Sequence, residues 1–194
     1  MKEEESKVFL PKVDLQSSYL LCYCDASLGN LNGGLNSTSG YIVFLTEQLS
    51  GKSCALNWQS KKIQRVVNST LAAESLALVE GLNATLYTRD LLTDMVGVDK
   101  SMIPIRIAID NKSTVEAVRS STTVGDKRLL RDIAAIKQLL ENDEVESINW
   151  VPGYKQLADV LTKRGVNGAN MKEVIQTGNL RDFLPYAYIS LALP

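Results

Sequence analysis

Hydrophobic residues follow two kinds of pattern along the chain. Short runs of apolar and β-branched residues predict strands at 19–24, 41–46, 53–58, 105–109 and 145–151. Longer stretches, in which apolar residues recur three and four positions apart, predict helices at 69–95, 111–118, 127–140 and 156–163. Turn-forming residues at 30–39 and 47–52 separate the first three strands, so these strands are expected to form an antiparallel meander.

The order of these elements is three strands followed by alternating helices and strands. That order predicts an α/β fold with a mixed sheet and helices on its faces. The long helix at 69–95 carries a stripe of small residues, which would let its backbone lie close to a sheet. The stripe consists of Ala73, Ala77, Gly81 and Ala84. With no internal repeat and no long linker, a single domain is expected.

Composition removes several kinds of chemistry. The chain has no histidine, which excludes Ser-His-Asp and Cys-His catalysis and histidine-ligated zinc. The net charge of -1 excludes a strongly basic nucleic-acid binder but leaves room for a local basic patch. The three cysteines, Cys22, Cys24 and Cys54, suggest neither a disulfide framework nor a zinc site. Any catalysis must therefore rest on Asp, Glu, Lys, Ser, Cys or metal-bound water.

The termini suggest neither a signal peptide nor a membrane span. The start of the chain is acidic, and no apolar run approaches the roughly 20 residues that cross a bilayer. Together with the cysteine count, this predicts a protein of the cytoplasm or the nucleus, without a membrane partner. The apolar tail at 183–194 is expected to be a docked or loose extension.

Four acidic residues stand at unusual places in this pattern. Asp25 and Asp110 are each predicted to end a strand, and Glu74 and Asp159 each interrupt an apolar, helical stretch. A charge in an apolar stretch is costly to bury unless it is paired or bound to a metal. An oxygen-only set of ligands suits Mg²⁺ or Mn²⁺. Taken singly, each acid could equally be a turn residue, a cap or a solvated side chain.

Six short blocks surround these acids. They are YCDAS at 23–27, STSGY at 37–41, WQSKK at 58–62, STLAAE at 69–74, IDNKS at 109–113 and QLADVLTK at 156–163. In this order the blocks resemble the ribonuclease H region of copia-type retrotransposon polyproteins. The resemblance extends from residue 9 to residue 180, and it is the combination of blocks that is specific.

This resemblance implies a type 1 ribonuclease H-like domain at 19–164, with a five-stranded mixed sheet of three antiparallel strands followed by two parallel ones. Residues 1–18 would then be the end of a reverse transcriptase connection, and 165–194 a C-terminal extension. The implied activity is endonucleolytic hydrolysis of the RNA strand of an RNA–DNA hybrid. A reverse transcriptase domain is an implied partner, and the chain itself is expected to be a monomer.

The resemblance also implies two Mg²⁺ ions roughly 4 Å apart, with Mn²⁺ as a substitute. Asp25 would bridge both ions. Glu74 and Asp110 would hold the ion on the leaving-group side, and Asp159 the ion that carries the attacking water. The chain departs from many ribonucleases H in lacking a histidine in the loop 152–157. It also has little room between residues 118 and 127 for the basic helix of some cellular relatives.

Basic and aromatic residues offer candidate contacts to the hybrid. Lys52, Lys61, Lys62 and Arg65 occur without an intervening acid, and Trp58 lies among them. They could follow a nucleic-acid backbone, or they could be a solvated turn with Trp58 in the core. Weaker candidates are Ser60, Ser69 and Asn111. A second basic group could likewise be a solvated helix face; it comprises Arg119, Lys127, Arg128 and Arg131.

Two other functions stay open at this stage. A domesticated, catalytically silent ribonuclease H-like module could bind nucleic acid or protein, although the four intact acids speak against it. A nuclease or transferase acting on DNA strands fits the sequence blocks poorly. Cleavage of a labelled hybrid separates the enzyme from the silent module, and cleavage of double-stranded DNA would identify the third class.

Overall fold

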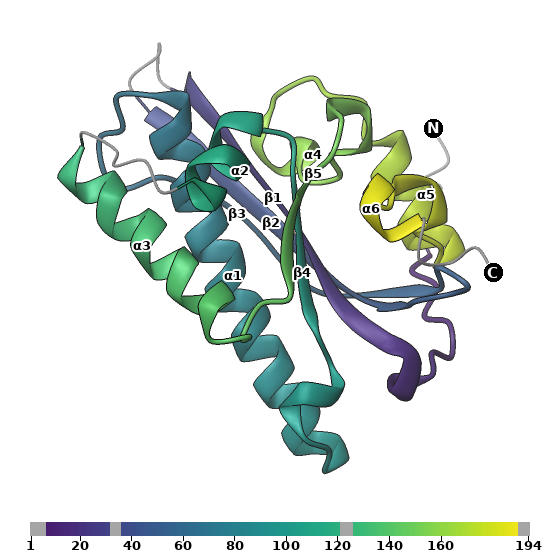
Figure 1. The fold of residues 1–194 in the computed structure, drawn as a ribbon. Coiled ribbons are helices and arrows are strands. Elements are labelled where there is room, and N and C mark those ends of the chain that lie inside the picture. Colours follow the sequence, from purple (N-terminus) through teal and green to yellow (C-terminus); the bar gives the residue numbers. More distant parts are fainter. Residues whose placement is uncertain (1–6, 32–35, 121–125, 190–194) are drawn as a thin grey trace, which may run out of the picture.

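A computed structural model describes residues 7–31, 36–120 and 126–189 and contains a five-stranded sheet in the order β3-β2-β1-β4-β5 (Figure 1). The strands are β1 (Ser18–Leu31), β2 (Asn36–Glu47), β3 (Ser53–Lys62), β4 (Ile105–Ile109) and β5 (Ser147–Trp150). The pairs β1–β2 and β2–β3 are antiparallel, whereas β1–β4 and β4–β5 are parallel. This confirms the expected mixed sheet.

Helices cover both faces of the sheet, as predicted (Figure 1). One face packs against α1 (Thr70–Val96), α2 (Lys112–Arg119) and α3 (Lys127–Glu141). The opposite face packs against α4 (Asp159–Thr162), α5 (Ala169–Thr177) and α6 (Tyr186–Ile189). Short 3-10 turns lie at Leu15–Ser17, Lys100–Met102, Gly153–Lys155 and Arg181–Phe183.

The central strand β1 reads as a continuous apolar run because both of its faces are covered. Cys22 and Cys24 belong to the hydrophobic cluster under α1, whereas Tyr19, Leu21 and Tyr23 belong to the cluster on the opposite face. Successive side chains of a strand alternate between the two faces, so neither face of β1 tolerates exposed polar residues in this stretch.

Polar side chains cap the starts of α1 and α2. The Ser69 side chain accepts a hydrogen bond from the Ala72 backbone N–H (3.1 Å) at the start of α1. Asn111 does the same for the Thr114 N–H (3.0 Å) at the start of α2. Each cap satisfies a backbone donor that has no partner inside the helix.

Some predicted boundaries are wrong. The expected turn at 30–39 is much shorter, because β1 runs to Leu31 and β2 starts at Asn36; residues 32–35 lie outside the described part of the chain. The strand pairing continues here through Ser27 opposite Thr38 and, after an irregularity, Leu31 opposite Asn36. Residues this polar give no apolar strand pattern in the sequence. The third strand likewise continues past residue 58 to Lys62.

The last helix of the sheet region is also shorter than expected. It was predicted over 156–163, but α4 spans only Asp159–Thr162. The backbone N–H of Ala158 donates to the Gln156 side chain (3.1 Å) and not to a backbone carbonyl of a helix. A 3-10 turn at Gly153–Lys155 precedes it.

The C-terminal segment is docked onto the sheet. Leu184 and Tyr188 are buried, and the Arg106 guanidinium lies over the rings of Tyr19 and Tyr188, 4.1 and 4.9 Å from their centroids. Arg106 also pairs with Glu146 through two hydrogen bonds of 2.9 and 3.0 Å. Within the described residues, no helix has the length and hydrophobicity to cross a bilayer. Residues 190–194 lie outside the described part.

Gly81 determines how closely α1 lies on β1. A Cβ at this position would overlap the Sγ of Cys24 and lie 3.1 Å from the Sγ of Cys22. We therefore expect Gly81→Ala to lower the free energy of unfolding by about 1–3 kcal/mol, measured by urea denaturation. Gly168→Ala is the control, because a Cβ there meets only Val160 at an ordinary 3.6 Å; its effect should stay below about 1 kcal/mol. Equal stability of the two variants would contradict the close approach.

Candidate active site

Asp25 lies in the middle of the sheet. It is fully buried in β1, opposite Gly40 of β2, which in turn is opposite Ser60 of β3. The prediction that Asp25 ends its strand is therefore wrong: β1 continues beyond it because the polar hairpin residues keep pairing. Its side chain lies on the face that packs against α4.

Two further carboxylates converge on Asp25. Asp110 directly follows β4, as predicted, and β4 runs parallel to β1 with Ala108 beside Tyr23. Glu74 comes from the second turn of α1, where it accepts a hydrogen bond from the backbone of Ala26. One carboxylate oxygen of each residue lies within 4.8 Å of the others. Residues from three elements thus form one compact carboxylate cluster, Asp25–Glu74–Asp110.

The cluster has the properties of a binding site for a hard divalent cation. Glu74 is only 5% exposed, and its Oε2 is buried without a hydrogen-bond partner. A buried acceptor without a partner is unfavourable, and a cation would satisfy it. Three carboxylates offer only oxygen ligands, the type that Mg²⁺ and Mn²⁺ prefer. The residues present therefore fit the metal expected from the sequence.

Burial and mutual repulsion shift the acidity of the cluster. Burial, together with the charges of Asp25 and Asp110, raises the pKa of Glu74 to about 9. Burial raises the pKa of Asp25 to about 6, partly offset by a hydrogen bond from Thr162 and the charge of Lys163. The pKa of Asp110 is also raised by burial. A divalent cation at the cluster would favour the ionised forms of all three groups.

The fourth acid, Asp159, lies outside this cluster. Its Oδ1 is 2.5 Å from the Nζ of Lys163, which is also 3.3 Å from the Oδ1 of Asp25. Burial alone would lower the pKa of Lys163, but the hydrogen bond to Asp159 and the charge of Asp25 raise it above its usual value. Sequence reasoning missed Lys163, although its spacing of four from Asp159 was a usable signal for an ion pair.

Gly40 is a second residue that sequence reasoning missed. A Cβ there would lie 2.8 Å from the Cβ of Leu161 and 2.9 Å from the Cγ2 of Thr162. The absence of a side chain lets α4 lie directly on β2, so that the Thr162 hydroxyl donates a hydrogen bond to Asp25 Oδ2. A glycine inside a strand is a known sign of such close approach. Gly40 thereby holds Asp159 and Lys163 next to Asp25.

Gln156 ties the loop before α4 to the sheet. Its Nε2 donates a hydrogen bond of 2.8 Å to the Cys24 carbonyl, and its side chain also bonds to the Asp110 carboxylate. The residue is buried, so these bonds are shielded from water. Gln156 thereby ties β1 to the residue that follows β4.

The candidate nucleic-acid contacts on β3 divide between the two faces of the sheet. Trp58 (61% exposed), Ser60 and Lys62 lie on the same face as Asp25, and the Ser60 hydroxyl donates to the Leu161 carbonyl of α4. Lys61 lies on the opposite face and pairs with Glu80 of α1 (3.1 Å). The alternative prediction, that Trp58 belongs to the core, is therefore wrong.

The other candidate contacts are already engaged within the protein. Arg65 pairs with Asp132 of α3, and Ser69 and Asn111 cap helices. In the second basic group, Arg119 donates to the Ile148 carbonyl (2.9 Å). The remaining members, Lys127, Arg128 and Arg131, are exposed on α3. Lys52 lies at the far end of β3 from Lys62, so the basic residues do not form one continuous strip.

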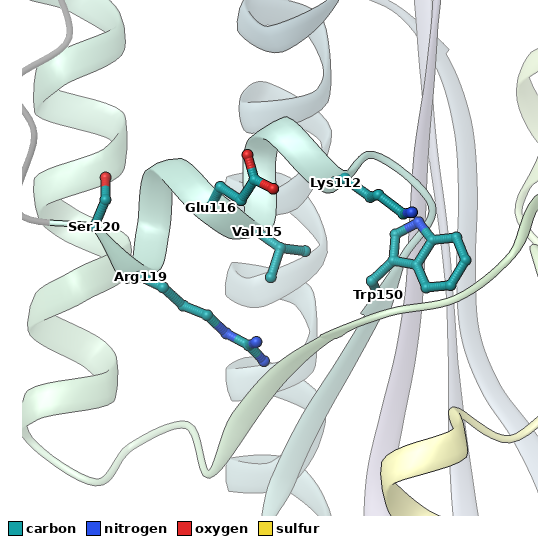
Figure 2. A pocket seen from close by; sticks show the side chains of 6 residues that line it. All are labelled: Lys112, Val115, Glu116, Arg119, Ser120 and Trp150. Carbon is teal, nitrogen blue, oxygen red and sulfur yellow. The ribbon is translucent and has the colours of Figure 1, made fainter.

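A pocket of about 450 Å³ lies between α2 and β5 (Figure 2). The Lys112 ammonium lies over the ring of Trp150, 4.5 Å from its centroid, as Figure 2 shows. The Trp150 indole N–H donates to the Asp110 carbonyl (2.9 Å) and so fixes the backbone at that acid. None of the four acids lines the pocket, which is formed by Lys112, Val115, Glu116, Arg119, Ser120 and Trp150.

Comparison with solved structures identifies the fold. The RNase H1 of Halobacterium salinarum NRC-1 is 22% identical, with a TM-score of 0.51 over 74% of this chain and 94% of that one. The N-terminal RNase H domain of a Mycobacterium tuberculosis protein is 23% identical, with a TM-score of 0.51 over 75% and 91%. LC11-RNase H1, solved in complex with an RNA/DNA hybrid, is 19% identical, with a TM-score of 0.52 over 74% and 93%.

The chain therefore has a ribonuclease H-like fold, as the sequence resemblance implied. No protein-family model and no curated protein matches the sequence.

The shifted acidity of Glu74 gives a prediction for the metal-free protein. Asp25, whose pKa is about 6, is mostly ionised above that pH. Between about pH 6 and about pH 9, the folded state therefore holds a proton on Glu74 that the unfolded state has lost. Stability should therefore fall as pH rises through this window, by up to about 1.4 kcal/mol per pH unit. Chemical denaturation with a chelator at several pH values measures this slope.

Glu74→Gln should flatten the slope, whereas Glu80→Gln, a change further along the same helix, should retain it. A slope that is unchanged in Glu74→Gln would show that another group titrates in this window.

Proposed function

We propose that this chain is a divalent-cation-dependent endonuclease that hydrolyses the RNA strand of RNA–DNA hybrids. The observation that carries the proposal is the cluster Asp25–Glu74–Asp110, with its unpartnered buried Glu74 oxygen, in a ribonuclease H-like fold. The six sequence blocks support a further step, an origin in the reverse transcriptase polyprotein of a copia-type retrotransposon. A reverse transcriptase domain is then its natural partner.

The residues at the site divide into ligands and supports. Asp25, Glu74 and Asp110 would hold a cation, with Asp159 toward a second one; such ions activate water and stabilise the leaving oxygen in phosphodiester hydrolysis. Thr162 orients one oxygen of Asp25, and Gln156 bonds to the Asp110 carboxylate. These hydrogen bonds hold the Asp25 and Asp110 carboxylates in position before substrate arrives.

The face around Asp25 offers a path for the hybrid. Trp58 and Lys62 are exposed on this face, two residues before and after Ser60, which is in the cross-strand row from Asp25 through Gly40. An exposed tryptophan offers stacking area, and a lysine offers a phosphate contact. Selectivity for the RNA strand would come from contacts to 2′-hydroxyl groups. One solved structure of similar fold is itself in complex with an RNA/DNA hybrid.

Asp25→Asn tests the catalytic assignment. Removing the central carboxylate should lower cleavage of a labelled RNA–DNA hybrid in Mg²⁺ by at least about 100-fold. The fold should persist, and thermal stability without cation should stay equal or rise, because carboxylate repulsion is relieved.

Asp182→Asn, a change at an exposed acid near the C-terminus, is the matched control and should cleave normally. Near-normal cleavage by Asp25→Asn would contradict the proposed site. Hybrid binding by the parent chain with no cleavage at all would identify a silent binding module instead.

The opposite orientation of two adjacent lysines gives a test of the hybrid surface. With a net charge of -1, the chain should show a shallow salt dependence of hybrid affinity, equivalent to about three to five phosphates. Lys62→Ala should weaken binding and reduce that slope by about 1. Lys61→Ala should change little, because the Lys61 ammonium is paired with Glu80 on the other face.

The measurement is a hybrid titration at several salt concentrations, with Ca²⁺ in place of Mg²⁺ to prevent cleavage. A larger effect of Lys61→Ala than of Lys62→Ala would place the hybrid on the α1 face and overturn this surface.

A further inference from the structure

We propose that the Lys163 ammonium serves as a monovalent cation of this site. In the free protein its ammonium takes the place of one divalent ion, between Asp25 and Asp159. The chain alone then binds a single divalent ion, at the cluster Asp25–Glu74–Asp110, and a second ion can bind only when Lys163 leaves. The inference rests on the metal binding of the proposed function, and it concerns this chain's own side chain.

The first support is the position of the ammonium. The Lys163 N–H donates to the Asp159 carbonyl (2.9 Å) and closes the last turn of α4, which brings its side chain back over Asp159. Its Nζ lies 2.5 Å from Asp159 Oδ1 and 3.3 Å from Asp25 Oδ1. One ammonium thus links Asp159, which lies outside the carboxylate cluster, to Asp25, which belongs to it.

The second support is burial. The Asp25 side chain is 0% exposed, so this end of the contact is shielded from solvent, while the Lys163 side chain keeps 35% exposure. An exposed ion pair contributes little, but an ammonium on a fully buried carboxylate compensates a charge that water cannot reach. The same geometry leaves a solvent-facing path by which Lys163 could leave without unfolding α4.

The third support is the charge balance of the facing groups. The charged groups at this point are Lys163 and the four acids Asp25, Glu74, Asp110 and Asp159. When all five groups are ionised and Lys163 is in place, one divalent cation almost neutralises the net negative charge of the site. A second divalent cation would give the site a net positive charge unless the ammonium moved away. The ammonium and a divalent cation bound to the same carboxylates would repel each other strongly in a partly buried site.

Mn²⁺ binding to the full chain, without nucleic acid, tests the inference. Calorimetric titration together with electron paramagnetic resonance should give one Mn²⁺ per parent chain. Lys163→Met, which keeps the length of the side chain but removes its charge, should give two Mn²⁺ per chain with a spin-coupled signal. Lys163→Arg and the control Lys100→Met should both give one. Lys100 is paired with Asp90, toward the C-terminal end of α1 and away from the site.

Two Mn²⁺ on the parent chain, or one on Lys163→Met, would overturn the inference. If Lys163→Met fails to fold, reductive methylation of the parent decides: Lys163 should react more slowly than Lys100 and stay protected at one equivalent of Mn²⁺. Loss of protection at that point would show that the first ion displaces it. Hybrid cleavage is scored separately, so a chain that cleaves hybrid but binds two ions alone would contradict only this inference.

Discussion

The structure depends on one buried charge. Asp25 lies in the middle of the central strand, covered on its own face by α4, with no water to solvate its carboxylate. A carboxylate in such a place must be neutralised, hydrogen-bonded or bound to a cation. The Thr162 hydroxyl and the Lys163 ammonium meet this need on one side, and the acids Glu74 and Asp110 prepare a cation position on the other.

Close packing of helices on both faces makes this arrangement possible. Gly81 lets α1 settle onto β1, which brings Glu74 to the level of Asp25, and Gly40 lets α4 settle onto β2 with Thr162 and Lys163. Because each glycine admits a helix that carries site residues, the two contacts serve packing and chemistry together. The cluster of carboxylates is unfavourable for the metal-free protein, and the dense cores on both faces offset it.

The two faces of the sheet also differ in whether their basic residues are paired or exposed. On the α1 face, Lys61, Arg65 and Arg119 are paired with groups inside the protein. On the α4 face, Trp58 and Lys62 are exposed beside the site. A strand alternates its side chains between faces, so the neighbours Lys61 and Lys62 lie in different surroundings despite identical chemistry.

The sequence by itself determined the order of elements, the mixed sheet with helices on its faces and the four candidate acids, because apolar periodicity is a local property. It did not determine the length of the β1–β2 hairpin, because polar residues such as Ser27 and Thr38 give no apolar strand pattern, and so Asp25 was wrongly predicted to end its strand. Only the tertiary structure decided which acids meet. It brings Asp25, Glu74 and Asp110 together, and it pairs Asp159 with Lys163 beside Asp25. The second arrangement depends on the close contact of α4 with Gly40 of β2, and the sequence does not indicate this contact because the two segments are far apart along the chain.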